Sequence, residues 1–358
     1  MKTGILTFFS ANNYGAVLQA YALQKKLTSE NVDCECIDYK CDAIEKMHQP
    51  RKLDIKYGLT GNAKNIIRNS RIKPRLKAFA PFRESIPHSK PYTKDTIAGA
   101  NKEYGAFITG SDQVFSFDLT GGDTAYFLDF VTDGKRKISY AASMGKYHDE
   151  YRDFYKEQLG SFDLLSFREK ATADIIKSEI NIDGQIVPDP VFLLTGDEWK
   201  KSLKTAEKSD GKYVFVYALY GSKALLGAAQ KLAREKNCRL YIVTKMNKLA
   251  VNADRIIRDA SPEEFIELIA NADYVLSDSF HGTAFSLLFK KQFYTVLPPK
   301  APGRITDLLS SDELKARIID DPGAADGREL DTSFSTQVTE SLRTAGENYI
   351  SLIKEKIR

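Results

Sequence analysis

The stretch VLSDSFHGTAFSLLF, at positions 275–289, contains the most specific group of residues whose types suit chemistry. An apolar run typical of a buried strand gives way to small polar residues, and a helical pattern follows. We expect Ser279 to cap that helix, with Asp278 and Gly282 beside His281. Of the four histidines in the chain, only His281 is placed in this way. His281 is a candidate general acid, and Ser279 and Gly282 are candidate substrate contacts; a purely structural histidine is the alternative.

A second polar strand end occurs in FITGSDQVF, at positions 107–115. Gly110 permits a tight turn, and Ser111 and Asp112 then place a hydroxyl and a carboxylate at the end of the strand. A carboxylate at this place could accept a proton from a sugar hydroxyl or orient it. Asp112 is therefore a candidate general base and Ser111 a candidate substrate contact. The alternative is that Asp112 only forms the turn.

Small polar residues also follow the first apolar run, in SANNYG at positions 10–15. A helical pattern comes next, so free backbone N–H groups and the positive end of the helix dipole favour an anion here. Asn12, Asn13, Tyr14 and Gly15 are candidate substrate contacts on this basis. Asparagine before a helix is also ordinary capping chemistry, and the stretch lacks the glycine spacing of a phosphate-binding loop or a dinucleotide site.

Two arginines near predicted helix starts are candidates for binding an anionic substrate. Arg168 lies in LLSFREKA, where a strand passes into a helix, and Arg304 lies in PPKAPGRITDLL, just before an apolar helix. A guanidinium can bind two oxygens of a carboxylate or phosphate at once. For Arg168 the alternative is an ion pair with Glu169, which contributes little energy at a surface.

Strand and helix patterns alternate through most of the chain and predict an α/β fold. Near the start, a strand over 2–9 precedes a helix whose apolar face runs from Ala16 to Leu27 at spacings of four, three and four. A strand over 32–39 completes a βαβ unit, whose sheet should be parallel. A second alternating series starts near residue 211.

The alternation predicts two Rossmann-like domains that face one another across a cleft, with ligands at the carboxyl ends of their strands. We expect the first domain at 1–200, with a basic insertion at about 50–95, and the second at 211–330. A polar linker is predicted at 200–212. A final helix at about 337–358 is expected to pack back on the first domain.

The net charge of +4 is unevenly distributed. Residues 51–94 hold twelve Lys or Arg against two acidic residues, so the rest of the chain carries a net charge of −6. A partner with phosphates, either an anionic lipid surface or a lipid-linked saccharide, suits this segment, although a solvated surface helix is the simpler interpretation. Aromatic residues are sparse in the segment and no nucleic-acid motif is present, so we set nucleic acid aside.

No stretch approaches the ~18 apolar residues that a membrane span requires, and the first residues form a strand pattern, so we expect a soluble, cytoplasmic protein. Four cysteines do not make a disulfide scaffold at a length of 358 residues. Cys34, Cys36 and Cys41 are close in sequence, but no fourth ligand has the spacing of a zinc site. We therefore predict small buried thiols and no metal.

Together these stretches resemble the polysaccharide pyruvyl transferase family. The likeness rests on NNYGAVLQAYAL, FITGSDQVF, ISYAASMG, LLSFRE, VPDPVFLL and ADYVLSDSFHGTAFSLLF, in that order, from residue 12 to about 289. It implies a GT-B-like fold and transfer of a carboxyethylidene unit from phosphoenolpyruvate to two sugar hydroxyls, with release of phosphate, in exopolysaccharide or capsule biosynthesis. Many members have Ser-x-Arg-x-His at the last strand end, whereas here Ser279 occupies the arginine position. Arg168 or Arg304 would have to compensate.

The implied donor carries a phosphate and a carboxylate, so its site should combine Arg168, Arg304 and His281 with helix N-termini. His281 would protonate the enol carbon, and Asp112 would accept the proton of the attacking hydroxyl. Asp189, in VPDPVF, is expected to hold a turn or to position the acceptor. This chemistry requires no cofactor and no metal, so we expect metal-independent turnover.

Two alternatives stay open. A GT-B nucleotide-sugar glycosyltransferase would share the architecture but bind a nucleoside diphosphate in place of phosphoenolpyruvate. A non-catalytic saccharide-binding protein would keep its sugar binding after His281→Ala. Under the preferred interpretation, a lipid-linked saccharide acceptor would place the protein in peripheral contact with the anionic inner face of the membrane.

Overall fold

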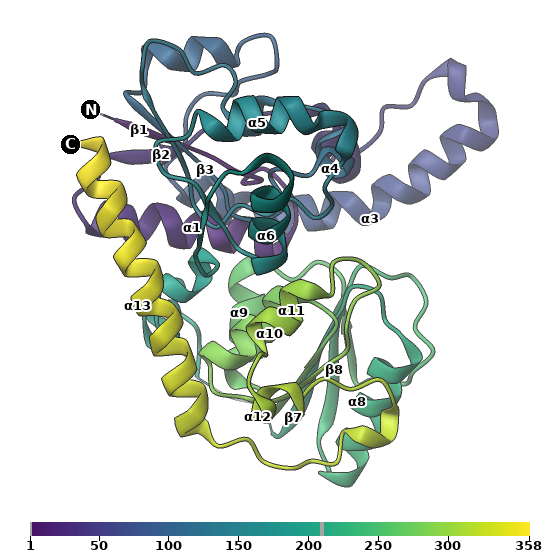
Figure 1. Cartoon of the computed structure of the whole chain (residues 1–358). Helices are drawn as coiled ribbons and strands as arrows, with labels where there is room; N and C mark the ends of the chain where they lie inside the picture. Colours follow the sequence, from purple (N-terminus) through teal and green to yellow (C-terminus); the bar gives the residue numbers. More distant parts are fainter. Residues whose placement is uncertain (1, 208–210) are drawn as a thin grey trace. The chain divides into compact units, whose positions relative to one another are not determined.

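The computed structural model describes residues 2–207 and 211–358 (Figure 1). The chain divides into two units, each with its own parallel sheet. Unit 1 comprises Met1–Leu193 and Arg343–Arg358, and unit 2 comprises Leu194–Leu342. The predicted fold class, α/β with two Rossmann-like units, is confirmed.

The sheet of unit 1 is parallel throughout. Its strands are β1 (Thr3–Leu6), β2 (Cys34–Cys36), β3 (Ala106–Thr109) and β4 (Arg136–Ser139), in the order β2-β1-β3-β4. A separate parallel pair is formed by β5 (Ser166–Phe167) and β6 (Gln185–Ile186). Every residue of β1 and β3 is buried, as expected for central strands covered on both faces.

Helices connect the strands of unit 1. Helix α1 (Tyr14–Ser29) buries the predicted apolar face from Ala16 to Leu27. Helix α3 (Gly58–Ser85) occupies much of the basic insertion and buries only Asn65, Phe79 and Phe82. The other helices are α2 (Asp42–His48), α4 (Phe117–Thr120), α5 (Arg152–Gly160) and α6 (Lys170–Ile180). Short 3₁₀ turns are η1 (Ile55–Tyr57), η2 (Ile97–Lys102), η3 (Ala125–Phe127), η4 (Asp149–Tyr151) and η5 (Pro190–Leu193).

Unit 2 repeats the design with five parallel strands. They are β7 (Tyr213–Ala218), β8 (Arg239–Thr244), β9 (Arg255–Ile257), β10 (Tyr274–Ser277) and β11 (Gln292–Thr295), in the order β11-β10-β7-β8-β9. The central strand β7 is buried along its whole length. The helices are α7 (Gly196–Leu203), α8 (Lys223–Glu235), α9 (Pro262–Asn271), α10 (Phe280–Leu288), α11 (Gly303–Leu308), α12 (Asp312–Lys315) and the 3₁₀ turn η6 (Pro322–Ala324).

Some boundaries differ from the sequence predictions. The first strand ends at Leu6, and the next apolar side chains, Phe8 and Phe9, are buried outside it. The predicted linker at 200–212 begins inside α7, because a capping box between Thr195 and Glu198 starts that helix upstream. Residues 208–210 of the predicted linker lie outside the described residues.

The final helix, α13 (Thr332–Ile357), starts before the predicted residue 337. Its residues from Arg343 onward are part of unit 1. The Tyr349 hydroxyl donates a hydrogen bond to the Ser139 carbonyl at 2.9 Å, and Ile353 is fully buried. Among the described residues, no helix combines the length and the apolar character needed to cross a bilayer.

Candidate functional site

In each sheet the strand order reverses at one pair of neighbours, β1 and β3 in unit 1 and β7 and β10 in unit 2. Loops diverge at such a point, which is where open parallel sheets bind ligands. The polar stretch at 10–15 follows β1, Ser111 and Asp112 follow β3, and the stretch around His281 follows β10. Each unit therefore has its candidate residues at the place that the topology favours.

The turn after β3 depends on Gly110. Its φ is +114°, and a Cβ at this position would lie 2.3 Å from the Tyr140 carbonyl oxygen, so only glycine fits. The turn leaves Ser111 fully buried and gives Asp112 a φ of +68°. The Ser111 hydroxyl donates to the Ala141 carbonyl at 2.9 Å. This loop is held firmly against the one that follows β4.

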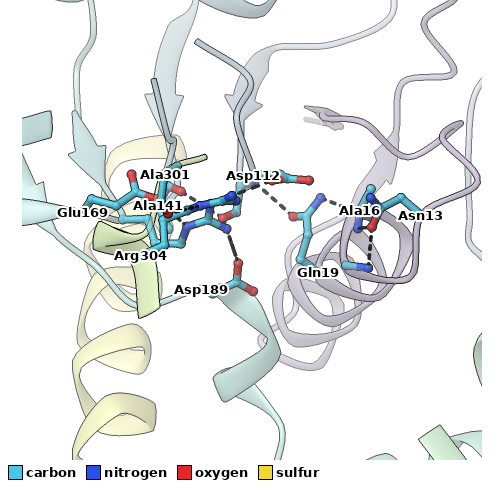
Figure 2. Close-up of polar contacts among 12 residues, drawn as sticks. Asn13, Ala16, Gln19, Asp112, Ala141, Glu169, Asp189, Ala301 and Arg304 are labelled. Atoms are coloured by element: carbon cyan, nitrogen blue, oxygen red, sulfur yellow. Dashed lines mark hydrogen bonds and ion pairs between the residues drawn. The ribbon is translucent and has the colours of Figure 1, made fainter. Parts of the chain in front are cut away.

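A buried glutamine ties the strand ends of unit 1 together. The Gln19 amide nitrogen donates to the Ala16 carbonyl at 2.9 Å (Figure 2) and to the Thr7 hydroxyl at 2.7 Å. Its amide oxygen accepts from the Ser111 N–H at 3.0 Å. The Thr7 hydroxyl donates to the Ser111 carbonyl at 3.2 Å, which closes the network. Gln19 was not among the predicted site residues. The feature of the sequence that could have indicated it is a single amide side chain among the apolar residues of one helix face.

Arg168 lies at the centre of a buried charge cluster. Its Nη1 contacts Asp189 Oδ2 at 2.7 Å, its Nε contacts Glu169 Oε1 at 3.0 Å, and its Nη2 contacts Asp112 Oδ1 at 3.8 Å. The Ser111 hydroxyl also donates a longer hydrogen bond, of 3.3 Å, to Asp189 Oδ2. We call Asp112, Arg168, Glu169 and Asp189 the carboxylate cluster; Figure 2 shows its three acidic members.

The charges of this cluster change the expected role of Arg168. Burial alone would lower the pKa of the guanidinium, but Glu169, Asp189 and Asp112 outweigh burial and raise that pKa above its ordinary value. One cation faces three carboxylates, so the group as a whole disfavours a further anion. Arg168 Nη2 forms a long ion pair with the Asp112 carboxylate, and the pair with Glu169 is buried rather than a surface pair.

At the first strand end, the capping interpretation accounts for the contacts of Asn13. Asn13 is the N-cap of α1, with its side chain accepting from the N–H groups of Gly15 and Ala16. Asn12 donates to the His48 carbonyl at 3.1 Å and accepts from Arg83 at 2.8 Å. Tyr14 and Gly15 are buried. Substrate contact by Asn12, Asn13, Tyr14 and Gly15 stays a prediction.

The loop after β10 in unit 2 is organised by Asp278. Its buried carboxylate accepts from the N–H groups of Leu219, Tyr220 and Gly221 at 2.7, 2.9 and 2.8 Å, which fixes the loop after β7. Burial outweighs these hydrogen bonds and raises the pKa of the Asp278 carboxyl above its ordinary value. Asp278 thus joins the two strand ends at which the order of this sheet reverses.

The start of α10 carries the predicted residues of unit 2. Ser279 is the N-cap residue, as predicted, but its side chain makes no capping hydrogen bond. His281 is 6% exposed, and its ring meets the Phe280 ring edge to face at 5.1 Å. Gly282 allows α10 to lie close to β10, because a Cβ at this position would lie 2.2 Å from the Ser277 hydroxyl oxygen. Ser279, His281 and Gly282 are thereby brought together at one helix N-terminus.

Arg304 lies in the first turn of α11, a helix that contacts α10. Its Nε donates to the Ala301 carbonyl at 3.5 Å. Among the described residues, no group of three or more His, Cys, Asp or Glu side chains is arranged to hold a metal ion. Cys34, Cys36 and Cys41 are buried, and burial raises the pKa of each thiol.

The comparison with protein families decides the assignment. The sequence profile of one family, described as polysaccharide pyruvyl transferase, matches residues 13–298. The chain belongs to the polysaccharide pyruvyl transferase family. It is therefore a transferase, and the matched region includes Asp112, Arg168 and His281. The comparison with curated proteins found no match.

Solved structures similar to this pyruvyl transferase family member share its two-unit α/β fold. UDP-GlcNAc 2-epimerase from Methanocaldococcus jannaschii is 10% identical, with a TM-score of 0.53 over 99% of this chain and 100% of that one. A putative UDP-N-acetylglucosamine 2-epimerase from Listeria monocytogenes is 11% identical, with a TM-score of 0.51 over 100% and 96% of the two chains. The Rickettsia bellii enzyme is 10% identical, with a TM-score of 0.51 over 99% and 98%. At these identities the likeness concerns the fold alone, which is GT-B-like as expected.

Proposed function

We propose that this transferase moves a carboxyethylidene group from phosphoenolpyruvate to two hydroxyls of a sugar and releases phosphate. The observation that carries the proposal is the family match over residues 13–298. Two features support it: a carboxylate, Asp112, paired with Arg168 at the strand ends of unit 1, and an imidazole, His281, at a helix N-terminus of unit 2.

The donor anion is assigned to the start of α10. The amides of the first helical turn have no partner within an α-helix and lie at the positive end of its dipole. The Ser279 side chain makes no capping hydrogen bond there, so its hydroxyl can serve a ligand. The carboxylate cluster is a poor alternative, because its three acids would repel phosphate and carboxylate groups. Arg304 is proposed as an additional cation for the donor.

The acceptor hydroxyl is assigned to Asp112. A carboxylate accepts an O–H donor well, and Asp112 is the most exposed acid of the carboxylate cluster, with 15% of its side chain accessible. The cluster's negative charge suits a neutral alcohol and a base that must take up its proton. Ser111 is buried and bonded to Ala141 and Asp189, so we propose that it supports the turn.

In the proposed reaction, His281 donates a proton to the methylene carbon of the enol, and positive charge develops at the carbon that bears the phosphate oxygen. The first sugar hydroxyl adds to that carbon and gives its proton to Asp112. The bond between this carbon and the phosphate oxygen then breaks, and phosphate leaves. The second hydroxyl adds, gives its proton to the His281 imidazole that the first step left neutral, and closes the cyclic ketal.

We further propose that the acceptor belongs to a polysaccharide or its lipid-linked precursor, as in exopolysaccharide or capsule synthesis. The support is the basic segment at 51–94, which suits a phosphate-bearing carrier or an anionic membrane surface. The chain would then work in the cytoplasm, in peripheral contact with the inner membrane face.

The proposal is tested by incubating the purified chain with phosphoenolpyruvate and a panel of glycosides while free phosphate and ketal products are measured. We expect Asp112→Asn and His281→Gln each to lower kcat by about 100-fold or more. The matched controls are Asp95→Asn and His88→Gln, both at exposed positions, which should retain activity. Release of a nucleoside diphosphate from a nucleotide sugar, with no phosphate from phosphoenolpyruvate, would favour a glycosyltransferase instead.

A further inference from the structure

The segment 47–73 stands out because of its exposed apolar side chains. Twelve large hydrophobic side chains are exposed in the described part of the chain, and seven of them lie between Met47 and Ile67. Ile55 is 98% exposed and Leu59 is 91% exposed. Scattered apolar residues on a surface need no explanation, but a concentration such as this marks an interaction site.

This segment, which we call the arm, has a defined structure. It consists of the end of α2, a strap at 49–57 that runs back along the N-terminal half of α3, and that half itself, which extends outward from the rest of unit 1 (Figure 1). Asn62 and Asp54 exchange two hydrogen bonds, of 3.0 and 3.1 Å, and Asn69 and Arg51 exchange two more, of 2.7 and 2.8 Å.

Arg68 completes the attachment of the strap. It donates to the carbonyls of Gln49, Lys46 and Met47 at 2.7, 2.9 and 3.1 Å. Asn62, Asn69 and Arg68 all contact the strap. A helix turns about 100° per residue, so Ala63 and Ile67 lie away from the strap, with Leu59 and Ile66 at the side of that face. All four apolar residues are exposed.

The charge of the arm identifies what covers this apolar face. From Arg51 to Lys77 there are nine Lys or Arg and one acidic residue, Asp54. Lys52, Lys64 and Lys73 are exposed around the apolar side chains. A second copy of the arm would bring like charges together, and single-stranded nucleic acid would need stacking aromatics, of which the exposed stretch has only Tyr57.

We propose that the arm docks this protein on an anionic lipid bilayer. Leu59, Ile66 and the side chain of Ile55 enter the boundary between headgroups and acyl chains, while the lysines and arginines contact lipid phosphates. The surface does not depend on the identity of the donor, because it lies outside both strand-end groups. It deepens the proposed function by naming the surface that would bring the enzyme to a lipid-linked acceptor.

The test is sedimentation of the full chain with vesicles, without any substrate. We expect retention on vesicles of about one-third phosphatidylglycerol in phosphatidylcholine, no retention on pure phosphatidylcholine, and steep weakening between about 0.05 and 0.5 M salt. Failure to bind anionic vesicles at low salt would overturn the proposal and leave the proposed chemistry untouched, because phosphate release is measured with soluble glycosides.

Two arm variants, each with a control elsewhere on the surface, distinguish binding by the arm from a general effect of charge or apolar surface. Lys52→Glu/Lys64→Glu/Lys73→Glu should weaken vesicle binding by about 100-fold or more, whereas Lys102→Glu/Lys156→Glu/Lys248→Glu, with the same net charge, should bind nearly as the wild type. Ile55→Ser/Leu59→Ser should also weaken binding, and Ile175→Ser/Ile186→Ser, at exposed sites elsewhere, should not. Equal losses in an arm variant and its control would overturn the proposal. So would an arm-dependent dimer, seen by sedimentation velocity, that binds no vesicles.

Discussion

Three carboxylates surround the Arg168 guanidinium at 2.7, 3.0 and 3.8 Å. The two short contacts, to Asp189 and Glu169, fix the plane of the guanidinium, and the longest leaves Asp112 accessible. Removing one partner of a buried ion pair usually costs about 3–5 kcal/mol, since the remaining charge is left uncompensated. Asp189 and Glu169 therefore support the position of Asp112 as well as the stability of unit 1.

At the residue scale, the pKa of Asp278 leads to a prediction about pH. Burial raises this pKa, so the folded protein binds the proton more tightly than the unfolded chain. The stabilising contribution is complete below the ordinary pKa of about 3.9 and is lost as the pH rises through the raised value. We expect the stability advantage of the wild type over Asp278→Asn to shrink with rising pH, as measured by urea unfolding at a series of pH values.

The control for this prediction is Asp259→Asn, at an exposed position of the same unit. Its difference from the wild type should stay nearly constant over the same pH range. A difference between the wild type and Asp278→Asn that is equally constant, or that grows with pH, would show that burial does not dominate the titration of Asp278.

The sequence was sufficient to name candidate site residues, but not the residues that they contact. Asp112 and His281 stand at strand ends because alternating patterns locate strand ends well. Arg168 was expected to bind an anion, and it contacts Asp189, which is 21 residues away along the chain. Gln19 bonds to Ser111 across 92 residues. Such pairs depend on tertiary packing, which local patterns do not encode.

At the element scale, the contact between β10 and α10 depends on Gly282. An added Cβ would lie 2.2 Å from Oγ and 2.8 Å from Cβ of Ser277, so strand and helix would have to separate. We expect Gly282→Ala to destabilise unit 2 by about 1–3 kcal/mol and to lower activity. Thermal unfolding and phosphate-release assays would measure both effects. Gly303→Ala, where nothing lies within 4 Å, is the control and should be nearly neutral.

A double-mutant cycle tests the cause of this effect. Gly282→Ala should cost less in a Ser277→Gly background, because the crowded side chain is then absent. An equal cost in both backgrounds would mean that the clash is not the reason, and that glycine is needed at this position for another property of the helix start.

Helix starts show what local sequence can specify. The residues Ser-Pro-Glu-Glu at 261–264 are typical of a helix start, and the Ser261 side chain accepts from the Glu264 N–H at the start of α9. The local pattern is sufficient here because all the partners lie within four residues. Ser279 occupies the same position at α10, yet its side chain makes no capping bond. Position in the sequence fixes the backbone of a cap, but the hydroxyl's orientation depends on its surroundings.

At the scale of the whole molecule, the alternation of elements was sufficient to predict two parallel sheets. Strand and helix periods differ, and parallel strands need helical crossovers, so the fold class follows from the pattern. The extent of unit 1 could not be predicted in this way, because it includes residues 343–358, which follow the whole of unit 2 in the sequence. Their assignment depends on contacts such as Tyr349 with Ser139, 210 residues apart.

The packing of the C-terminal part of α13 in unit 1 leads to a prediction about stability. Ile353 is fully buried, and Leu352 beside it is 36% exposed. We expect Ile353→Ala to destabilise the protein by about 2–5 kcal/mol, because it leaves a cavity in the core, and Leu352→Ala to have a much smaller effect. Urea unfolding followed by circular dichroism would compare them. Similar effects for the two variants would argue against packing of this helix in the core of unit 1.

The division of α13 also has a consequence for the order of events during translation. A ribosome makes residues 1–193 first, then all of unit 2, and only afterwards residues 343–358, which supply Tyr349, Ile350 and Ile353 to the interior of unit 1. Domains made early commonly fold while synthesis continues. Unit 1 must therefore wait, with part of its interior open, until residues 343–358 have been made.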